Sequence, residues 1–122
     1  MTDAPRATDT PRPDIRLDIR VGTITDARPS AAAFGPGYGP PGCQLWIDFG
    51  PRIGVKQSTT HLSARYTPET LIGRQVCAVI NVPQRQIGSC YSEVLTLDMP
   101  DKSGEVLLIR PDHTVPDGGM LF

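Results

Sequence analysis

The chain has 122 residues, of which 39% are hydrophobic and 20% charged, and its formal net charge is −1. This is the size of a single domain, large enough to bury a core without metals or disulfides. No apolar run approaches the length of a membrane span, and the first residues lack a signal-peptide pattern, so we expect a soluble cytoplasmic protein.

Residues 1–14 (MTDAPRATDTPRPD) carry three prolines and no apolar periodicity. They predict a disordered tail ahead of one domain over residues 15–122. Apolar and polar side chains then alternate over residues 17–24, which predicts a strand, and Gly22 within it indicates a bulge or a bend. Glycine and proline dominate residues 30–42, which predict a long loop.

A second strand is predicted over residues 43–50. Its apolar face, which we expect in the core, holds Cys43, Leu45, Ile47 and Phe49. The only tryptophan, Trp46, falls on the opposite, polar face. Because the strands of a small β-barrel can be covered on both sides, we expect Trp46 to be buried, with exposure on the polar face as the alternative.

A short helix is predicted after a third strand over residues 52–59. Within residues 66–74, Thr67 suits the N-cap, Pro68 the first helical position and Gly73 the C-terminal stop. Three further strands follow, over residues 75–82, 92–99 and 105–110. One helix between the third and fourth strands is the element order of an OB-fold. We therefore predict an all-β, five-stranded OB-fold barrel with extra terminal strands, with a generic β-sandwich as the alternative.

The cysteines are odd in number and widely spaced, and no CxxC motif is present; they are Cys43, Cys77 and Cys90. Together with two distant histidines, His61 and His113, they predict reduced thiols and no metal site. The chain has no G-x-S-x-G motif, no P-loop and no paired catalytic carboxylates, so we expect neither enzymatic activity nor a cofactor.

The small net charge hides a separation of charge along the sequence. Residues 52–92 hold five basic residues against one acidic residue, or +4, and residues 93–122 hold two against six, or −4. An anionic partner responds to where positive charge lies rather than to its total. Residues 52–92 are thus the candidate contact for such a partner, with plain solvation of the charges as the alternative.

Seven blocks of sequence carry a family resemblance: DIRVGTI (18–24), LWIDFG (45–50), IGVKQS (53–58), YTPETLIGRQVCAVINVP (66–83), RQI (85–87), SEVLTL (92–97) and PDHTVPDGG (111–119). Together they resemble the CsaA family, prokaryotic export-related chaperones built on a tRNA-binding OB-fold. The resemblance implies a homodimer without catalytic chemistry that binds unfolded or preprotein polypeptides. The family is also similar to the tRNA-binding domains attached to some aminoacyl-tRNA synthetases, which implies tRNA as the alternative partner.

Related tRNA-binding domains place three residues of the connection NVPQRQIGSCYSEVL on their RNA-facing side, and these correspond to Asn81, Arg85 and Ser92. An arginine can pair with a phosphate or stack on a base. We add Lys56 and Ser58, which the alternation of the third strand assigns to its polar face. The alternatives are backbone capping by Asn81 and Ser92 and plain solvation of the two cations.

The chain departs from the family pattern at Val82, Gln84 and Tyr91, which makes positive charge thinner and predicts weaker tRNA binding. Glu93 is expected to accept a bond from Arg85 or Arg74 or to lie in a dimer contact. For a peptide partner the candidates are exposed aromatic side chains, namely Phe34, Tyr38, Trp46 and Tyr91. A dimer interface explains such a patch equally well, and the apolar end of the chain, 120–122, is expected in the dimer seam.

Overall fold

The computed structural model describes residues 16–30, 42–61, 65–87 and 90–121. The predicted tail and nearly all of the glycine- and proline-rich loop lie outside these residues. The elements are β1 (Ile19–Ser30), β2 (Gly42–Asp48), β3 (Val55–His61), α1 (Pro68–Leu71), β4 (Gln75–Val79), β5 (Arg85–Ile87), β6 (Cys90–Ser92), β7 (Leu95–Thr96), β8 (Asp98–Pro100) and β9 (Val106–Leu108). No helix among the described residues is long and apolar enough to cross a membrane.

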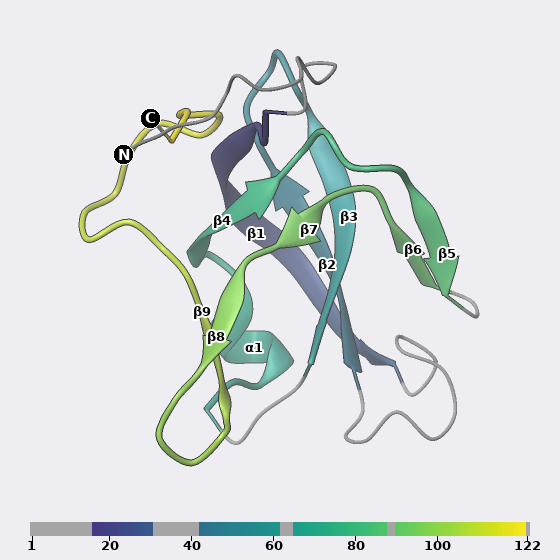
Figure 1. The fold of residues 1–122 in the computed structure, drawn as a ribbon, viewed down its shortest axis with the longest axis vertical. Coiled ribbons are helices and arrows are strands. Elements are labelled where there is room, and N and C mark those ends of the chain that lie inside the picture. The colour runs from purple at the N-terminus through teal and green to yellow at the C-terminus, as the bar shows by residue number, and fades with distance from the viewer. Residues whose placement is uncertain (1–15, 31–41, 62–64, 88–89, 122) are drawn as a thin grey trace, which may run out of the picture.

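Five strands form one antiparallel sheet in the order β3-β2-β1-β4-β7, which curls into a nearly closed barrel (Figure 1). The two ends of this order meet where Glu93 N donates to Gln57 O at 2.8 Å. The helix lies between β3 and β4 in the chain. The OB-fold prediction is confirmed.

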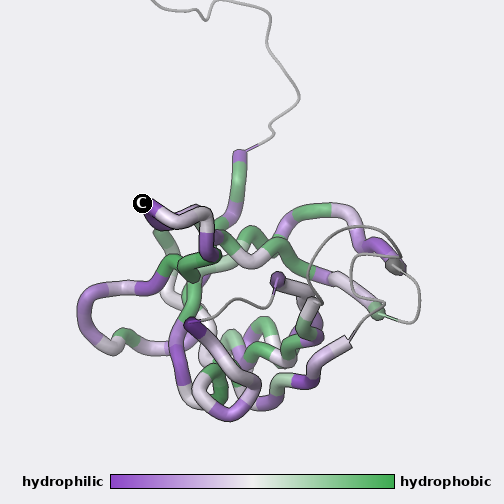
Figure 2. Tube along the Cα trace, turned by 90° about the horizontal axis from the view of Figure 1, so that it is seen from below, coloured by the Kyte–Doolittle hydropathy of each residue, from purple (hydrophilic) through white to green (hydrophobic). Residues whose placement is uncertain are grey.

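The core fills the inside of the barrel. It consists of Ile24, Ala27, Cys43, Leu45, Ile47, Phe49, Leu71, Val76, Ala78, Val94 and Leu108. The four core residues predicted for the second strand are all in this set, although Phe49 lies directly after the end of β2, and the predicted alternation is confirmed. Figure 2 shows hydrophobic stretches along the central strands and hydrophilic stretches on the surrounding loops.

Gly22 does not mark a bulge. It pairs in register with Val76 of β4, and the irregularity of β1 lies between Ile24 and Asp26. A Cβ atom on Gly22 would lie 2.6 Å from Ile47 Cγ2 and 2.8 Å from Phe49 Cδ1. A side chain has no room at position 22, because the core side chains of Ile47 in β2 and of Phe49 directly after it occupy that space.

The helix α1 has the predicted caps. Thr67 Oγ1 accepts from Thr70 N at 3.3 Å, and Thr70 Oγ1 accepts from Thr67 N at 2.9 Å, which is a reciprocal capping box. Pro68 occupies the first turn, and Gly73 follows with a φ of 90°. The helix is four residues long and buries Leu71 against the barrel core.

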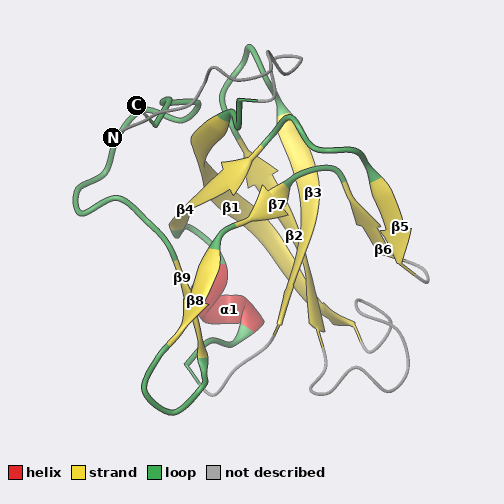
Figure 3. Ribbon diagram, in the orientation of Figure 1, coloured by secondary structure: helices red, strands yellow, loops and turns green. Residues whose placement is uncertain are grey.

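The second half of the chain is more broken than predicted, because the described residues contain nine strands rather than six (Figure 3). The predicted strand over residues 92–99 is divided among β6, β7 and β8, since residues 93 and 94 turn away to bond with Gln57 of β3. The connection before it forms a hairpin of its own, β5–β6.

Residues 117–121 run beside the first half of β1. Gly118 N donates to Val21 O at 2.7 Å, Val21 N to Gly119 O at 3.0 Å, and Leu121 N to Ile19 O at 2.9 Å. This part of β1 pairs with β4 on its other side, and β2 joins β1 only from Thr23 onward. The C-terminal segment thus covers an edge of β1 that the barrel leaves open.

Candidate nucleic-acid and peptide interface

The hairpin β5–β6 brings two of the predicted residues together. Arg85 and Ser92 are cross-strand partners and therefore share one face of the hairpin. Both line a pocket of about 280 Å³, whose other walls are apolar and consist of Val82, Pro83, Val94 and Leu95. We call this site the hairpin pocket.

Arg85 and Ser92 offer different groups to a ligand at this pocket. Arg85 is exposed and makes no ion pair within the described part of the chain. The Ser92 hydroxyl donates to Val94 O at 2.9 Å, so it shapes the hairpin base and keeps only acceptor capacity. The site therefore has one unpaired cation at the edge of an apolar hollow, which suits a stacked base beside a phosphate or an apolar side chain.

Asn81 has a structural connection instead. Its Oδ1 accepts from Asp18 N at 2.8 Å, and its Nδ2 donates to Arg16 O at 2.6 Å. The amide thus ties the turn after β4 to the segment that leads into β1. Asn81 therefore bonds to the backbone, as in the alternative of backbone capping. Its partners lie more than 60 residues away in the sequence, rather than within the connection between β4 and β7.

Lys56 and Ser58 lie on the core side of β3, so their assignment to the polar face is wrong. They pair in register with Ile47 and Leu45, whose side chains are in the core. Ser58 is fully buried; its hydroxyl donates to Val94 O at 3.1 Å and shares a bond with Thr96 Oγ1 at 2.6 Å. It closes the barrel and is inaccessible to a ligand.

The outward face of β2 and β3 carries the pairs Gln44–Thr59 and Trp46–Gln57. Trp46 is partly rather than fully buried, and the Arg28 guanidinium lies 5.0 Å from its ring centroid. Gln44 Nε2 donates to Gln57 Oε1 at 3.1 Å and to Tyr91 O at 2.9 Å. This face therefore supports the hairpin through Gln44 and Gln57. This role was not predicted, because the bonds join residues far apart in the sequence.

Glu93 fixes the base of the hairpin. Its Oε1 accepts from Gln57 N at 2.9 Å, while its own N–H donates to Gln57 O. The carboxylate thus takes the place that a carbonyl of a neighbouring strand would have at the edge of β3. The prediction that Glu93 accepts a bond from Arg85 or Arg74 is wrong.

Of the four aromatic candidates for peptide binding, two lie within the described residues. Phe34 and Tyr38 lie outside the described residues. Tyr91 is 38% exposed, and its hydroxyl donates to Gln84 Oε1 of the same hairpin. Tyr91 and Trp46 therefore remain the described aromatic candidates near the hairpin.

A second apolar surface lies beside the C-terminal segment. It is a groove of about 330 Å³, which we call the C-terminal groove, lined by Ile19, Val21, Cys77, Leu97, Ile109, Arg110, Pro111, Val115, Gly119, Met120 and Leu121. Met120 and Leu121 are more than half exposed, at 54% and 58%. Backbone bonds hold this segment to β1, yet its apolar side chains face outward.

The three cysteines are free and buried. Burial raises the pKa of the Cys43 thiol to about 11 and also raises that of Cys77. Within the described ranges, no group of histidine, cysteine and carboxylate side chains is arranged to hold a metal ion.

Solved structures of known proteins are similar to this barrel. The crystal structure of the chaperone CsaA from Bacillus anthracis superposes with a TM-score of 0.76 and 39% sequence identity, covering 87% of this chain and 91% of that one. The chain belongs to the CsaA family. The CsaA chaperone of Picrophilus torridus agrees, with a TM-score of 0.75, 34% identity, and 88% and 92% of the two chains covered. No family model matches the chain.

Two further kinds of protein resemble this CsaA-family chain. The methionine–tRNA ligase of Porphyromonas gingivalis is 31% identical over 109 residues, 88% of this chain and 15% of the ligase. The ligase of Methanothrix thermoacetophila is 31% identical over 102 residues, 84% of this chain and 14% of its own length. A MetRS-related protein from Pyrococcus horikoshii shares the fold, with a TM-score of 0.69 at 21% identity. The chain thus spans about 15% of the length of these ligases.

Proposed function

We propose that this protein is a CsaA-type chaperone that binds unfolded or preprotein polypeptides at the hairpin pocket, in connection with protein export in the cytoplasm. The observation that carries the proposal is the match to CsaA chaperones over nine-tenths of their length. The pocket supports it, since apolar walls of this size accept one or two apolar side chains of an extended segment. No catalytic role is proposed.

Suppression of client aggregation tests this function. Leu95, which lines the pocket, is 46% exposed, whereas Ile72, after the helix, is 49% exposed and lies outside the pocket. Leu95→Asp should therefore abolish suppression of the aggregation of a thermally unfolded client, while Ile72→Asp retains it. Equal suppression by both variants would exclude the hairpin pocket as the client site.

The second candidate function is tRNA binding on the same hairpin. Two observations favour it, namely Arg85 without an ion pair at the pocket and the similarity to methionine–tRNA ligases. The shared part is about 15% of the ligase, which is too short to hold the whole ligase. We propose that this shared part is the tRNA-binding one.

Electrophoretic titration with tRNA at low and moderate salt tests this candidate. Arg85→Gln should weaken binding and lower the salt slope by about 1, as expected for one lost phosphate contact. Lys102→Gln should change neither, because Lys102 is also exposed but lies on the turn between β8 and β9 rather than on the hairpin. A wild-type protein that fails to retain tRNA even at low salt would remove this function.

We also propose that two copies associate through the C-terminal groove. An isologous dimer would cover Met120 and Leu121 on both copies. Sedimentation should give the mass of two chains for the wild type and of one chain for Leu121→Asp. A monomeric wild type at micromolar concentration would contradict the proposal.

A further inference from the structure

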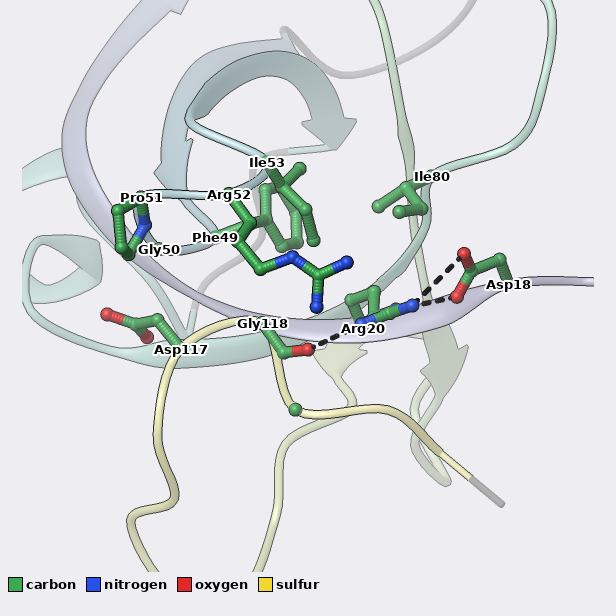
Figure 4. Close-up of a pocket in the computed structure, with 11 residues that line it drawn as sticks. Asp18, Arg20, Phe49, Gly50, Pro51, Arg52, Ile53, Ile80, Asp117 and Gly118 are labelled. Atoms are coloured by element: carbon green, nitrogen blue, oxygen red, sulfur yellow. Dashed lines mark hydrogen bonds and ion pairs between the residues drawn. The ribbon is translucent and has the colours of Figure 1, made fainter.

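A larger pocket, of about 490 Å³, lies away from the hairpin and is formed by four separated segments (Figure 4). Its lining comes from the start of β1, the turn between β2 and β3, Ile80 after β4, and the turn at residues 117–119. This volume falls within the range of sites for small organic ligands. It shares no lining residue with the hairpin pocket, which is the proposed client site, and shares Gly119 with the C-terminal groove.

Two turns in close backbone contact form part of the wall of this pocket. Gly50 and Gly118 have φ values of 92° and 89°. A Cβ atom on Gly50 would lie 2.9 Å from Asp117 O, and one on Gly118 would lie 2.6 Å from Phe49 O. Because neither turn can accept a side chain at the junction, the pocket is preformed rather than assembled by a ligand.

Arg20 lines the pocket but brings no net charge to it. Its Nε and Nη2 donate to the two carboxylate oxygens of Asp18 at 2.7 and 3.5 Å, and its Nη1 donates to Gly118 O at 2.9 Å. These bonds leave part of the N–H donors of the guanidinium unused. Arg20 is thus a neutralised hydrogen-bond donor that Asp18 and Gly118 hold in place.

Arg52 supplies a positive charge that no ion pair balances. It is exposed, makes no ion pair within the described residues, and its guanidinium extends over the pocket toward Arg20 in Figure 4. The other carboxylate of the lining, on Asp117, accepts from Thr23 Oγ1 at 2.6 Å and Gln75 Nε2 at 3.1 Å and points away from Arg52. One free cation suits a monoanion better than a dianionic phosphate, and the planar guanidinium fork matches a carboxylate.

The remaining walls select what the carboxylate is attached to. Ile53 and Ile80 present partly buried apolar side chains, and the buried Phe49 ring lies beside Ile53. We propose that this pocket binds an apolar monocarboxylate, with the carboxylate on Arg52 and Arg20 and the apolar group against Ile53 and Ile80. Two sources share this chemistry, a small apolar acid and the free C-terminus of a polypeptide that ends in an apolar residue.

Fluorescence polarisation tests the site with a short labelled peptide that ends in leucine, prepared as the free acid and as the C-terminal amide. The free acid should bind about tenfold or more tightly than the amide, since the charge-assisted bonds to Arg52 are lost with the amide. Arg52→Gln should remove this difference, whereas Lys102→Gln and Arg85→Gln should retain it. Equal binding of acid and amide, or an unchanged difference in Arg52→Gln, would overturn the proposal.

Competition with N-acetylleucine separates the two sources. Full displacement of the peptide at a dissociation constant close to that of the peptide assigns the site to a small acid. No displacement, with the acid–amide difference intact, assigns it to a polypeptide C-terminus. Because Arg85→Gln leaves this site untouched, a loss of tRNA or client binding in that variant does not bear on the carboxylate pocket.

Discussion

At the scale of single residues, polar side chains complete the backbone bonding that the strands leave unfinished. Glu93 takes the place of a carbonyl on the edge of β3, Asn81 joins the turn after β4 to the segment that leads into β1, and Ser58 bonds across the barrel closure. A substitution at any of them leaves a backbone group without its partner. We therefore expect a substitution at any of these residues to lower the stability of the fold.

Glu93 gives the clearest test of this role. Glu93→Ala should destabilise the protein by about 1–3 kcal/mol, because the partly buried Gln57 N–H loses its acceptor. Glu93→Gln should recover most of the loss, since an amide oxygen accepts the same bond. Urea unfolding measures both variants, and an unchanged midpoint for Glu93→Ala would contradict the role.

Asp101 makes the acid stability depend on one carboxylate. Arg65 Nε donates to Asp101 Oδ2 at 2.7 Å, and the N–H groups of Ser103 and Glu105 donate to Oδ1. The bond from Arg65, together with these two, lowers the pKa of the Asp101 carboxyl below its ordinary value of 3.8. A lowered folded-state pKa means that the stabilisation is present above pH 3.8 and is lost as the pH falls through the folded-state value.

The pH dependence of unfolding checks this sign. Asp101→Asn should lower the unfolding midpoint at about pH 6 and show a smaller further loss than the wild type on acidification to about pH 3. Asp98→Asn, on the neighbouring exposed strand, is the matched control and should follow the wild type. A parallel acid loss in wild type and Asp101→Asn would show that another group governs this range.

At the scale of elements, local patterns predicted what local contacts determine. The core face of β2 and the caps of α1 followed from alternation and from Thr67, Pro68 and Gly73. The face of β3 did not, because its residues 55–61 include a single aliphatic side chain and its register is set by the turn in which Gly54 N bonds to Gly50 O. The assignment of Lys56 and Ser58 failed for this reason.

The candidate site was predicted in part on the same grounds. The sequence indicated the connection that carries Arg85 and Ser92, but not the hairpin that makes them cross-strand partners. The hairpin depends on Gln44, Gln57 and Glu93, whose bonds join elements 13 to 47 residues apart. Such contacts leave no periodic signal in a single sequence.

Gly22 tests the packing of β1 on β2. Gly22→Ala should cost about 1–3 kcal/mol, because the added carbon overlaps Ile47 and Phe49 in a filled core. Gly73→Ala separates this overlap from backbone strain, since Gly73 has a φ of 90° but open space around it. The left-handed backbone alone should cost about 1–2 kcal/mol. Calorimetric unfolding that ranks Gly73→Ala above Gly22→Ala would contradict the packing explanation.

At the scale of the whole molecule, the fold disperses the positive charge that the sequence gathers in residues 52–92. Arg65 is paired with Asp101, and the Arg74 guanidinium lies 5.2 Å from the Tyr66 ring centroid. Within the described part of the chain, Arg52, Lys56 and Arg85 make no ion pair, and only Arg85 lies on the hairpin. A nucleic acid at the hairpin pocket would therefore make few phosphate contacts, which supports our proposal of a polypeptide as the main partner.

Site-specific photocrosslinking to an unfolded client tests the central claim most directly. A photoreactive side chain at position 95, beside the hairpin pocket, is compared with one at position 72, which is similarly exposed and apolar in the native protein. We predict client crosslinks from position 95 that an excess of unlabelled client removes, and none from position 72. Crosslinks of equal yield from both positions, or from position 72 alone, would contradict the assignment of the hairpin pocket as the client-binding site.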